Sequence, residues 1–344
     1  MQEELMVATL KDVAELAGVS VKTVSNVVNG YEFVREDNRR KVEAALEQTG
    51  YRPNIGARNL RRGRTGFLGL VVPDLGIPYF GELAGLVITA AQTNGWNVLI
   101  EQTQGQRERE LESIATLGPH MVDGAIVSPE ALVADDLATL PDGFPVVLLG
   151  EQTAGFALDR VAIDNVAAAR AATRHLIDLG RTRIAFIGDN PRRATAALRL
   201  QGYREELKAA RLTAPDDRVA GAESFHRHDG MLAMRALLDG PADDRPDAVF
   251  CCNDLLAVGA LHEAVRSGLR VPEDIAIIGF DGSDESRYSL PPLSTIAPDK
   301  TAIAAGAVRL ISERGSRLDG AGFEVVEPPF VLQARQSTTG AQES

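Results

Sequence analysis

The chain has 344 residues, 44% of them hydrophobic and 24% charged, and is long enough for two or three globular domains. No apolar run reaches the roughly 20 residues of a membrane span, and no signal peptide is recognisable, so we expect a cytoplasmic protein without a membrane partner. The two cysteines, Cys251 and Cys252, are adjacent, which excludes a disulfide framework.

The net charge of −12 is unevenly distributed. Residues 1–65 hold 11 lysines and arginines against 9 acids, a balance of +2, so the remainder carries −14. Phosphate contact depends on local basic charge. The acidity of the whole chain therefore does not exclude a nucleic-acid partner for its N-terminal part.

Residues 9–29 predict two short helices joined by a tight turn at Gly18. Thr9 and Ser20 are placed to cap the two helices, and a third helix is expected over about 36–48. Six apolar side chains are expected to pack the first two helices together: Val13, Leu16, Val19, Val24, Val27 and Val28. A short helix with a polar face, supported by a partner helix, is typical of a unit that enters the DNA major groove.

A basic connector, YRPNIGARNLRRGRT, occupies residues 51–65. Pro53 cannot lie inside a helix, and Gly56 weakens any helix over residues 54–60 by about 1 kcal/mol relative to alanine. We expect this connector to be only marginally helical on its own.

From residue 66 onward, short apolar runs alternate with amphipathic stretches, which predicts parallel sheets covered by helices on both faces. The length suggests two such sheets, with a ligand bound between them at the carboxyl ends of the strands. The expected strands are 67–72, 97–101, 124–128, 146–149, 183–187, 249–252, 275–280 and 330–333, and 293–298 is expected to be extended. The expected helices are 79–92, 166–179, 200–210, 230–238, 255–267 and 301–313.

A series of motifs then matches a known family in order. TLKDVAELAGVSVKTVSNVVNG begins at Thr9 and is followed by GYRPN, ARNL, GLVVPD, PYF, AIDN, ND, VPEDIAIIGFD and PPLSTI. Together they cover the chain from Thr9 to about Arg335, and the chain resembles the LacI/GalR family of bacterial transcriptional regulators.

The resemblance implies a small all-α helix-turn-helix headpiece followed by an α/β core of two doubly wound parallel-sheet lobes, like a periplasmic binding protein. We expect the headpiece at 1–50, a hinge at 51–65 and the core at 66–338. Three crossing strands would make each lobe discontinuous. The first lobe is expected at about 66–163 and 297–322, and the second at about 164–296 and 323–338.

In proteins similar to this one, three positions of the second helix face the bases, here Val21, Lys22 and Asn26. Lys22 can donate to guanine, Asn26 can pair with adenine, and Val21 can contact a thymine methyl group. The alternative is that the polar pair only solvates a helix face. Ser20, Thr23 and Ser25 are suited to phosphate contact, and Thr9 and Asn29 complete the expected DNA contacts of the headpiece.

The hinge is the second DNA element that the resemblance implies. In the family it becomes helical on operator DNA, and a leucine opens a base step from the minor groove; the matching residue is Leu60, with Arg58 and Arg61 beside it. The alternative is a flexible basic linker. Two such units on a twofold axis would read a palindrome, so a homodimer on double-stranded operator DNA is expected, and the tail lacks a leucine heptad that would favour a tetramer.

The resemblance also implies a small-molecule effector between the lobes. Asp281 is expected to accept from ligand hydroxyl groups, Arg199 to bind hydroxyl groups or a carboxylate, and Asn253 to lie at the pocket. Phe80 and Phe225 are expected to stack on an apolar ring face. Asp164, Arg193 and Thr195 complete the expected set. The competing interpretation is structural: the aspartates could cap helices, and Arg199 could pair with a carboxylate.

The pocket departs from sugar-responsive relatives at one position. Where a glutamine often follows the T-I-x segment, this chain has Pro298, followed by Asp299 and Lys300. A sugar is the expected effector, and a purine-like corepressor is the alternative.

Other functions are disfavoured. The chain lacks phosphate-loop, nucleophile-turn and zinc-protease motifs, so no enzyme activity, cofactor or metal is expected, and the His226–His228 segment is interpreted as a solvated loop. A ligand-binding protein without a DNA role remains the minor alternative, against which the headpiece argues.

Overall fold

The computed structural model describes residues 8–29, 31–51, 64–133, 135–136, 143–150, 157–191, 193–314 and 322–340. The chain divides into two compact units, Met1–Thr65 and Gly66–Ser344. Within the described residues, no helix combines the length and apolar character needed to cross a membrane.

The N-terminal unit consists of the three expected helices: α1 (Leu10–Ala17), α2 (Val21–Val28) and α3 (Glu36–Thr49). Gly18 ends α1 in the left-handed conformation, with φ of 62°, which lets the chain turn sharply into α2. Val13, Val24 and Val42 are fully buried where the three helices meet.

Leu16 does not join this core, and that expectation was wrong. The buried side chains of α1 are Val13, Ala14 and Ala17. Leu16 projects roughly 100° around the helix axis from the centre of that stripe, and 48% of its surface is exposed. The apolar spacing of the sequence alone did not separate the flank of the helix from its buried face.

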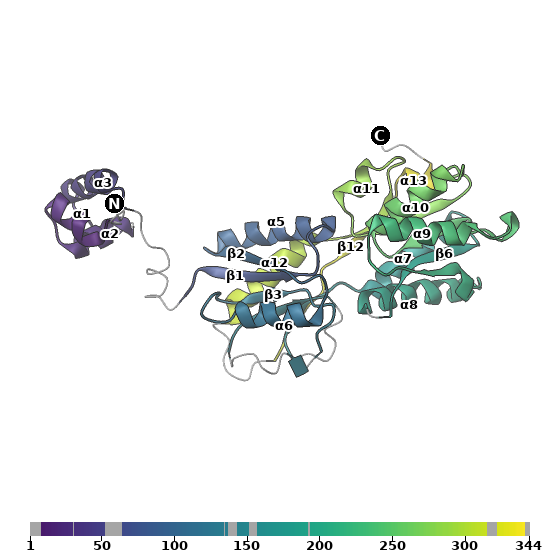
Figure 1. Cartoon of the computed structure of the whole chain (residues 1–344), viewed down its shortest axis with the longest axis horizontal. Coiled ribbons are helices and arrows are strands. Elements are labelled where there is room, and N and C mark those ends of the chain that lie inside the picture. The colour runs from purple at the N-terminus through teal and green to yellow at the C-terminus, as the bar shows by residue number, and fades with distance from the viewer. Residues whose placement is uncertain are drawn as a thin grey trace, which may run out of the picture. The chain divides into compact units, whose positions relative to one another are not determined.

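The C-terminal unit contains two six-stranded sheets, each with helices on both faces (Figure 1). The first sheet has the order β11-β5-β4-β3-β1-β2 and is parallel throughout. Its strands are β1 (Phe67–Val72), β2 (Asn97–Gln102), β3 (Ala125–Val127), β4 (Val146–Leu149), β5 (Asp159–Val161) and β11 (Val325–Val326).

Alternate residues of this sheet enter two separate cores. Leu68 and Leu70 pack with Leu83 of α5 (Pro78–Thr93) and with α12 (Lys300–Arg314), whereas Val71 packs with Ile114 of α6 (Arg107–Thr116). Successive side chains of a strand point to opposite faces. Because both faces are covered, β1, β3 and β4 are continuous apolar runs, as the sequence predicted.

The second sheet has the order β12-β10-β9-β8-β6-β7, and only β12 runs antiparallel to its neighbour. Its strands are β6 (Ile184–Asp189), β7 (Val219–Gly221), β8 (Ala248–Cys251), β9 (Ala276–Phe280), β10 (Ser294–Pro298) and β12 (Phe330–Gln333). The long helices pack in pairs, α7 (Asn165–Asp178) with α8 (Ala194–Ala209) and α9 (Arg227–Leu238) with α10 (Asp254–Arg266). The shorter helices are α11 (Asp284–Tyr288), α13 (Gln336–Thr339) and the 3-10 turns Asp216–Arg218 and Ala242–Asp244.

The chain passes between the lobes after β5, after β10 and between β11 and β12, so each lobe is discontinuous. The expected boundary at 323 was wrong. Val325 and Val326 of β11 pair with β5 of the first sheet, so the chain returns to the second lobe only after Val326. Likewise, β10 keeps the chain in the second sheet through Pro298. A strand of two residues is too short to show a hydrophobic pattern in the sequence. Its pairing with a neighbouring strand is what identifies the lobe to which it belongs.

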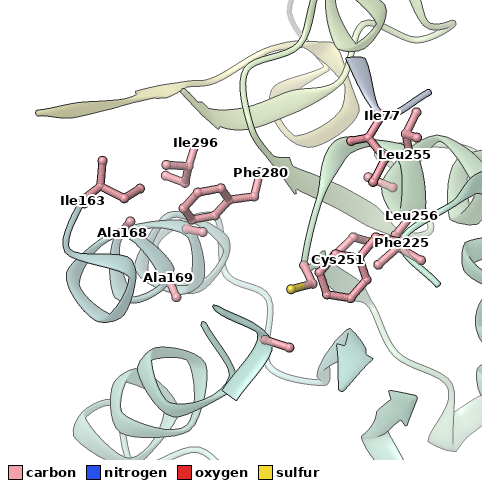
Figure 2. Close-up of a cluster of buried hydrophobic side chains, with 14 of the residues drawn as sticks. Ile77, Ile163, Ala168, Ala169, Phe225, Cys251, Leu255, Leu256, Phe280 and Ile296 are labelled. Atoms are coloured by element: carbon pink, nitrogen blue, oxygen red, sulfur yellow. The ribbon is translucent and has the colours of Figure 1, made fainter. Parts of the chain in front are cut away.

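The largest buried cluster is continuous from one lobe to the other. Figure 2 shows part of it, with Ile77 from the first lobe and Phe280 and Ile296 from the second sheet. Cys251 belongs to this cluster, and its neighbour Cys252 is equally buried, with both thiols free. Burial raises the pKa of Cys252 to about 11 and raises the pKa of Cys251 well above its usual value.

Candidate functional site: a helix face and an interlobe cavity

The α2 helix carries one buried and one exposed face. Val24 and Val27 are buried against the other helices, whereas Val21 and Lys22 are exposed and Asn26 is half-buried. Residues four positions apart lie on the same side of a helix, so Lys22 and Asn26 share the outer face of α2, and the exposed Val21 precedes them at the start of the helix. Within the described residues, no hydrogen bond occupies the Lys22 ammonium or the Asn26 amide.

The remaining polar residues of the headpiece build its helix ends. Thr9 and Asp12 form a reciprocal cap, in which the Thr9 backbone N–H donates to the Asp12 carboxylate at 2.7 Å. This bond lowers the pKa of Asp12. The Ser20 hydroxyl accepts from the backbone N–H of Thr23 at 3.1 Å, and the Asn29 side chain donates to the Ser25 carbonyl at 2.6 Å. These caps leave the exposed face of α2 for other contacts.

The hinge residues Arg58, Leu60 and Arg61 lie outside the described residues. Their expected roles stay predictions.

A cavity lies between the lobes of the C-terminal unit, at the carboxyl ends of the strands. Its floor and walls mix aromatic rings with a few polar groups, as small-molecule sites do. From the first lobe come Ile77, Tyr79, Phe80, Leu83, Ser128 and Glu130. From the second lobe come Asn165, Arg193, Thr195, Arg199, Phe225, Asn253 and Asp281.

Arg199 lies at the centre of the polar wall. Its Nε donates to Asn165 at 2.7 Å, and its guanidinium group lies 3.5 Å from the centroid of the Phe280 ring. One terminal nitrogen donates to the Cys252 carbonyl and lies 3.7 Å from the Asp281 carboxylate. This geometry fixes the guanidinium plane and leaves it beside Asp281 at the cavity surface.

Asp281 directly follows β9 and has a positive φ of 116°. Burial raises its pKa to about 7, although Arg199 acts in the opposite direction. A carboxyl group held this way can exchange between accepting and donating a hydrogen bond near neutral pH.

Asp254 has a structural role. Its carboxylate accepts from the Ser283 backbone N–H at 2.7 Å and from the hydroxyls of Ser283 and Thr295 at 2.8 and 2.7 Å. These bonds tie the start of α10 to the turn after β9 and so hold the segment that carries Asp281. Burial raises the pKa of Asp254 to about 6, against these hydrogen bonds.

Asn253 lines the cavity but also caps α10. Its side-chain oxygen accepts from the Leu256 backbone N–H at 2.9 Å, and its amide donates to the Phe225 carbonyl at 3.0 Å. Asn253 thereby positions Phe225, whose ring lines the cavity beside it.

Asp164 does not lie in the cavity lining, contrary to the expectation. Its carboxylate turns back to cap α7, accepting from the Ala167 backbone N–H at 2.8 Å. The next residue, Asn165, lines the cavity instead and accepts from Arg199. The sequence motif AIDN identified the correct segment, but its aspartate caps a helix and does not line the cavity.

Several contacts join the two lobes around the cavity. Arg193 donates to Glu130 at 2.6 Å, and His226 lies 3.0 Å from Asp74. Burial raises the pKa of Glu130, while Arg193 lowers it. The histidine that was assigned to a solvated loop therefore contacts the opposite lobe.

Lys300 makes the third connection. Its ammonium donates to the carbonyls of Asp281 and Gly282 at 3.0 and 2.9 Å and to the Glu82 carboxylate at 2.5 Å. Glu82 in turn accepts from the Asp284 backbone N–H at 3.0 Å. The segment Pro298–Lys300, which differs from that of sugar-responsive relatives, thus places a structural cation next to the Asp281 backbone.

Sequence reasoning missed Tyr79, Glu130 and Asn165 among the cavity residues. Tyr79 and Asn165 adjoin residues that the motifs did single out, Phe80 and Asp164, so the segments were correct. Glu130 lies in a loop without any motif, and nothing in its local sequence indicates a cavity. Among the described residues, no cluster of three or more histidine, cysteine or acidic side chains is arranged to hold a metal.

Two family descriptions match the chain: bacterial regulatory proteins of the lacI family over residues 9–54, and the periplasmic binding protein-like domain over residues 173–338. The repressor PurR of Haemophilus influenzae (strain PittEE) is 34% identical over 317 residues, which cover 91% of this chain and 92% of that protein. The ribose operon repressor of Haemophilus influenzae (strain ATCC 51907) is 34% identical over 309 residues, which cover 89% and 92%.

Solved structures agree with the sequence matches. The complex of the transcriptional regulator CelR with cellobiose is 31% identical, with a TM-score of 0.71 over 96% of this chain and 99% of that one. The relatives are transcriptional repressors, not enzymes. The chain belongs to the lacI family of bacterial regulatory proteins and is a DNA-binding transcriptional regulator.

Proposed function

We propose that this regulator represses transcription as a homodimer on a palindromic operator, and that a sugar bound between the lobes controls its affinity for DNA. The observation that carries this proposal is the cavity at the carboxyl ends of both sheets, in which Arg199 and Asp281 face apolar rings.

The cavity chemistry supports a sugar. Hydroxyl groups both donate and accept, and they match a guanidinium group next to a carboxyl group. Phe80 and Phe225 offer apolar faces to the C–H side of a pyranose or furanose ring. One relative is named for the ribose operon, and one related structure holds cellobiose.

A purine-like base is the second candidate. Three aromatic side chains, Tyr79, Phe80 and Phe225, line the cavity together with Thr195 and Asn165. A flat heterocycle could stack on the rings while its edge bonds to the polar groups.

The headpiece supports the operator part of the proposal. One short helix offers too little surface for specific binding, so two copies on a twofold axis would read an inverted repeat. We infer that ligand binding alters the lobe arrangement and thereby the paired hinges, with Leu60 as the minor-groove wedge and Arg58 and Arg61 on phosphates.

The test has two stages on the full chain. Thermal shifts with pentoses, hexoses, disaccharides and nucleobases identify the class of effector, and the proposal expects a sugar to stabilise the protein. Operator DNA selected from a random library is then titrated with and without that compound. Selected sites without an inverted repeat, or identical operator affinity under every compound that stabilises the core, would contradict the proposal.

A further inference from the structure

The loop after β3 is held by a buried carboxylate. Glu110 of α6 is fully buried, and its two oxygens accept from the backbone N–H groups of residues 130, 131 and 132, at 2.8, 3.1 and 3.0 Å. Three hydrogen bonds to one carboxylate fix the path of this loop. The loop carries Glu130 to the cavity wall, so the Glu110 carboxylate fixes the backbone from which the Glu130 side chain extends.

A glycine makes room for that side chain. Gly105 has a φ of +63°, and a Cβ built there would lie 2.2 Å from one carboxylate oxygen of Glu130. Any larger residue would push the carboxylate away. The missing Cβ at Gly105 therefore leaves space for the Glu130 carboxylate where it lies.

In that place Glu130 meets a cation of the opposite lobe. Arg193 donates to Glu130 at 2.6 Å, and both side chains are largely buried. The guanidinium group also lies 4.4 Å from the centroid of the Phe225 ring. Arg193 is therefore held at the cavity wall with its charge compensated from across the cavity.

The charged side chains of the cavity are paired. Among the described residues that line it, the charged ones form two pairs, Arg193 with Glu130 and Arg199 with Asp281. An anionic ligand would have to displace a carboxylate from its arginine or lie beside both carboxylates in a site of low dielectric. A ligand with hydroxyl groups and no charge meets neither obstacle.

We propose that Glu130 is a specificity residue: by pairing with Arg193 it makes the cavity select an uncharged ligand over a phosphorylated or carboxylated form of the same molecule. This inference rests on the proposed function of the cavity as the effector site and specifies its chemistry. Removing the carboxylate would leave Arg193 as an uncompensated buried cation, which attracts phosphate.

The test measures binding of inorganic phosphate, ribose, ribose 5-phosphate, glucose and glucose 6-phosphate to the full chain by calorimetry at constant ionic strength. In the natural protein we expect each phosphate ester to bind at least tenfold more weakly than its parent sugar. Glu130→Gln should bind inorganic phosphate at least tenfold more tightly than the natural protein does. The double variant Glu130→Gln with Arg193→Gln should lose that gain, because the attracting cation is gone.

Glu112→Gln is the matched control, since Glu112 is an exposed carboxylate on the same helix as Glu110. It should bind phosphate like the natural protein. Glu130→Ser provides a second route should the glutamine variant not fold, as judged by circular dichroism.

Two outcomes overturn the inference: phosphate binding that is equal in the natural protein and the Glu130 variants, or a gain that survives the loss of Arg193. The proposed function fails in a different way, when no sugar or nucleobase stabilises the natural protein. A phosphate gain in Glu130→Gln would then still show that Glu130 sets the charge of the cavity.

Discussion

Asp281 combines a buried carboxyl group with a direct place on the cavity wall. Its pKa in the folded protein is about 7, because burial disfavours the charged form, whereas in the unfolded chain it is about 3.9. The folded state therefore holds this proton more tightly. The stability that Asp281 contributes is fully present below about pH 4 and is lost as the pH rises through about 7.

Asp281→Asn cannot ionise, so it should not undergo this loss. The free energy of unfolding of the variant, minus that of the natural protein, is expected to rise between about pH 4 and pH 7, by up to about 1 kcal/mol per pH unit, and then to level off. Urea unfolding at several pH values measures this slope. Asp243→Asn, at an exposed aspartate, is the control for the substitution itself; a flat difference for Asp281→Asn would contradict the assignment.

Asn26 is the clearest residue with which to test how α2 reads DNA. Asn26→Ala should reduce affinity by about 1–3 kcal/mol for sites with the preferred base at one position of each half-site, and much less for other sites. Ser20→Ala removes a helix cap instead, at about 1 kcal/mol of headpiece stability, and should weaken all sites alike. Binding to a randomised operator library compares the two; a uniform loss in both variants would remove Asn26 from the base-reading set.

At the scale of elements, the contact between α9 and α10 depends on glycine. A Cβ at Gly259 would lie 1.9 Å from the Arg227 carbonyl oxygen, and one at Gly230 would lie 2.1 Å from the Leu256 carbonyl oxygen. In both cases the obstacle is backbone, which cannot rotate away. The two helices therefore approach as closely as their main chains permit.

Gly259→Ala should separate the helices and destabilise the core by about 1–3 kcal/mol or more, as overpacking does. Gly85→Ala on α5 is the matched control, because its Cβ would meet nothing within 4 Å; there we expect a gain of up to about 1 kcal/mol from helix propensity. Urea unfolding of both variants distinguishes a steric effect from a general effect of glycine replacement. Equal stabilities would show that α9 and α10 can move apart at little cost.

The sequence predicted the elements best where one pattern dominates. The strands β1, β4 and β9 are apolar on both faces, and they form as expected. The α6 helix was missed because its buried positions include Glu110 and Ser113, which give no apolar periodicity. The short strands β5, β7 and β11 were missed because pairing with a neighbour, not local sequence, creates them.

At the scale of the whole molecule, the two lobes are joined by a few buried polar contacts as well as by the continuous core. Lys300 is central, since its ammonium bonds to Glu82 of the first lobe and to the carbonyl groups of Asp281 and Gly282 in the second. Its side chain is only 12% exposed. Replacing the ammonium while keeping the aliphatic stem would leave these acceptors without their donor.

Lys300→Met is therefore expected to weaken the connection between the lobes and to loosen the turn that carries Asp281. The radius of gyration of the ligand-free protein should increase in small-angle scattering, and affinity for the identified effector should fall about tenfold. Lys208→Met, at an exposed lysine on α8, should change neither quantity. An unchanged radius of gyration with unchanged effector affinity would show that Lys300 is not needed to connect the lobes or to position Asp281.

Motifs placed Phe80, Arg199, Asn253 and Asp281 in the cavity lining, the last two just after strands and the first two on helices. They could not place Glu130, since its position depends on Glu110 below it and on Arg193 across the cavity. Contacts between distant segments leave no trace in local spacing. The pairing of charged side chains in the site was therefore visible only in three dimensions.

The two adjacent thiols of the second sheet can be used to measure how often this sheet opens locally. A maleimide reacts with an accessible thiolate, and Cys251 and Cys252 are fully buried with raised pKa values. Labelling of these thiols by maleimide therefore requires local opening of the sheet. The Cys252 carbonyl also accepts a hydrogen bond from Arg199, which lines the cavity. A ligand bound in the cavity should therefore slow the maleimide labelling of these natural cysteines.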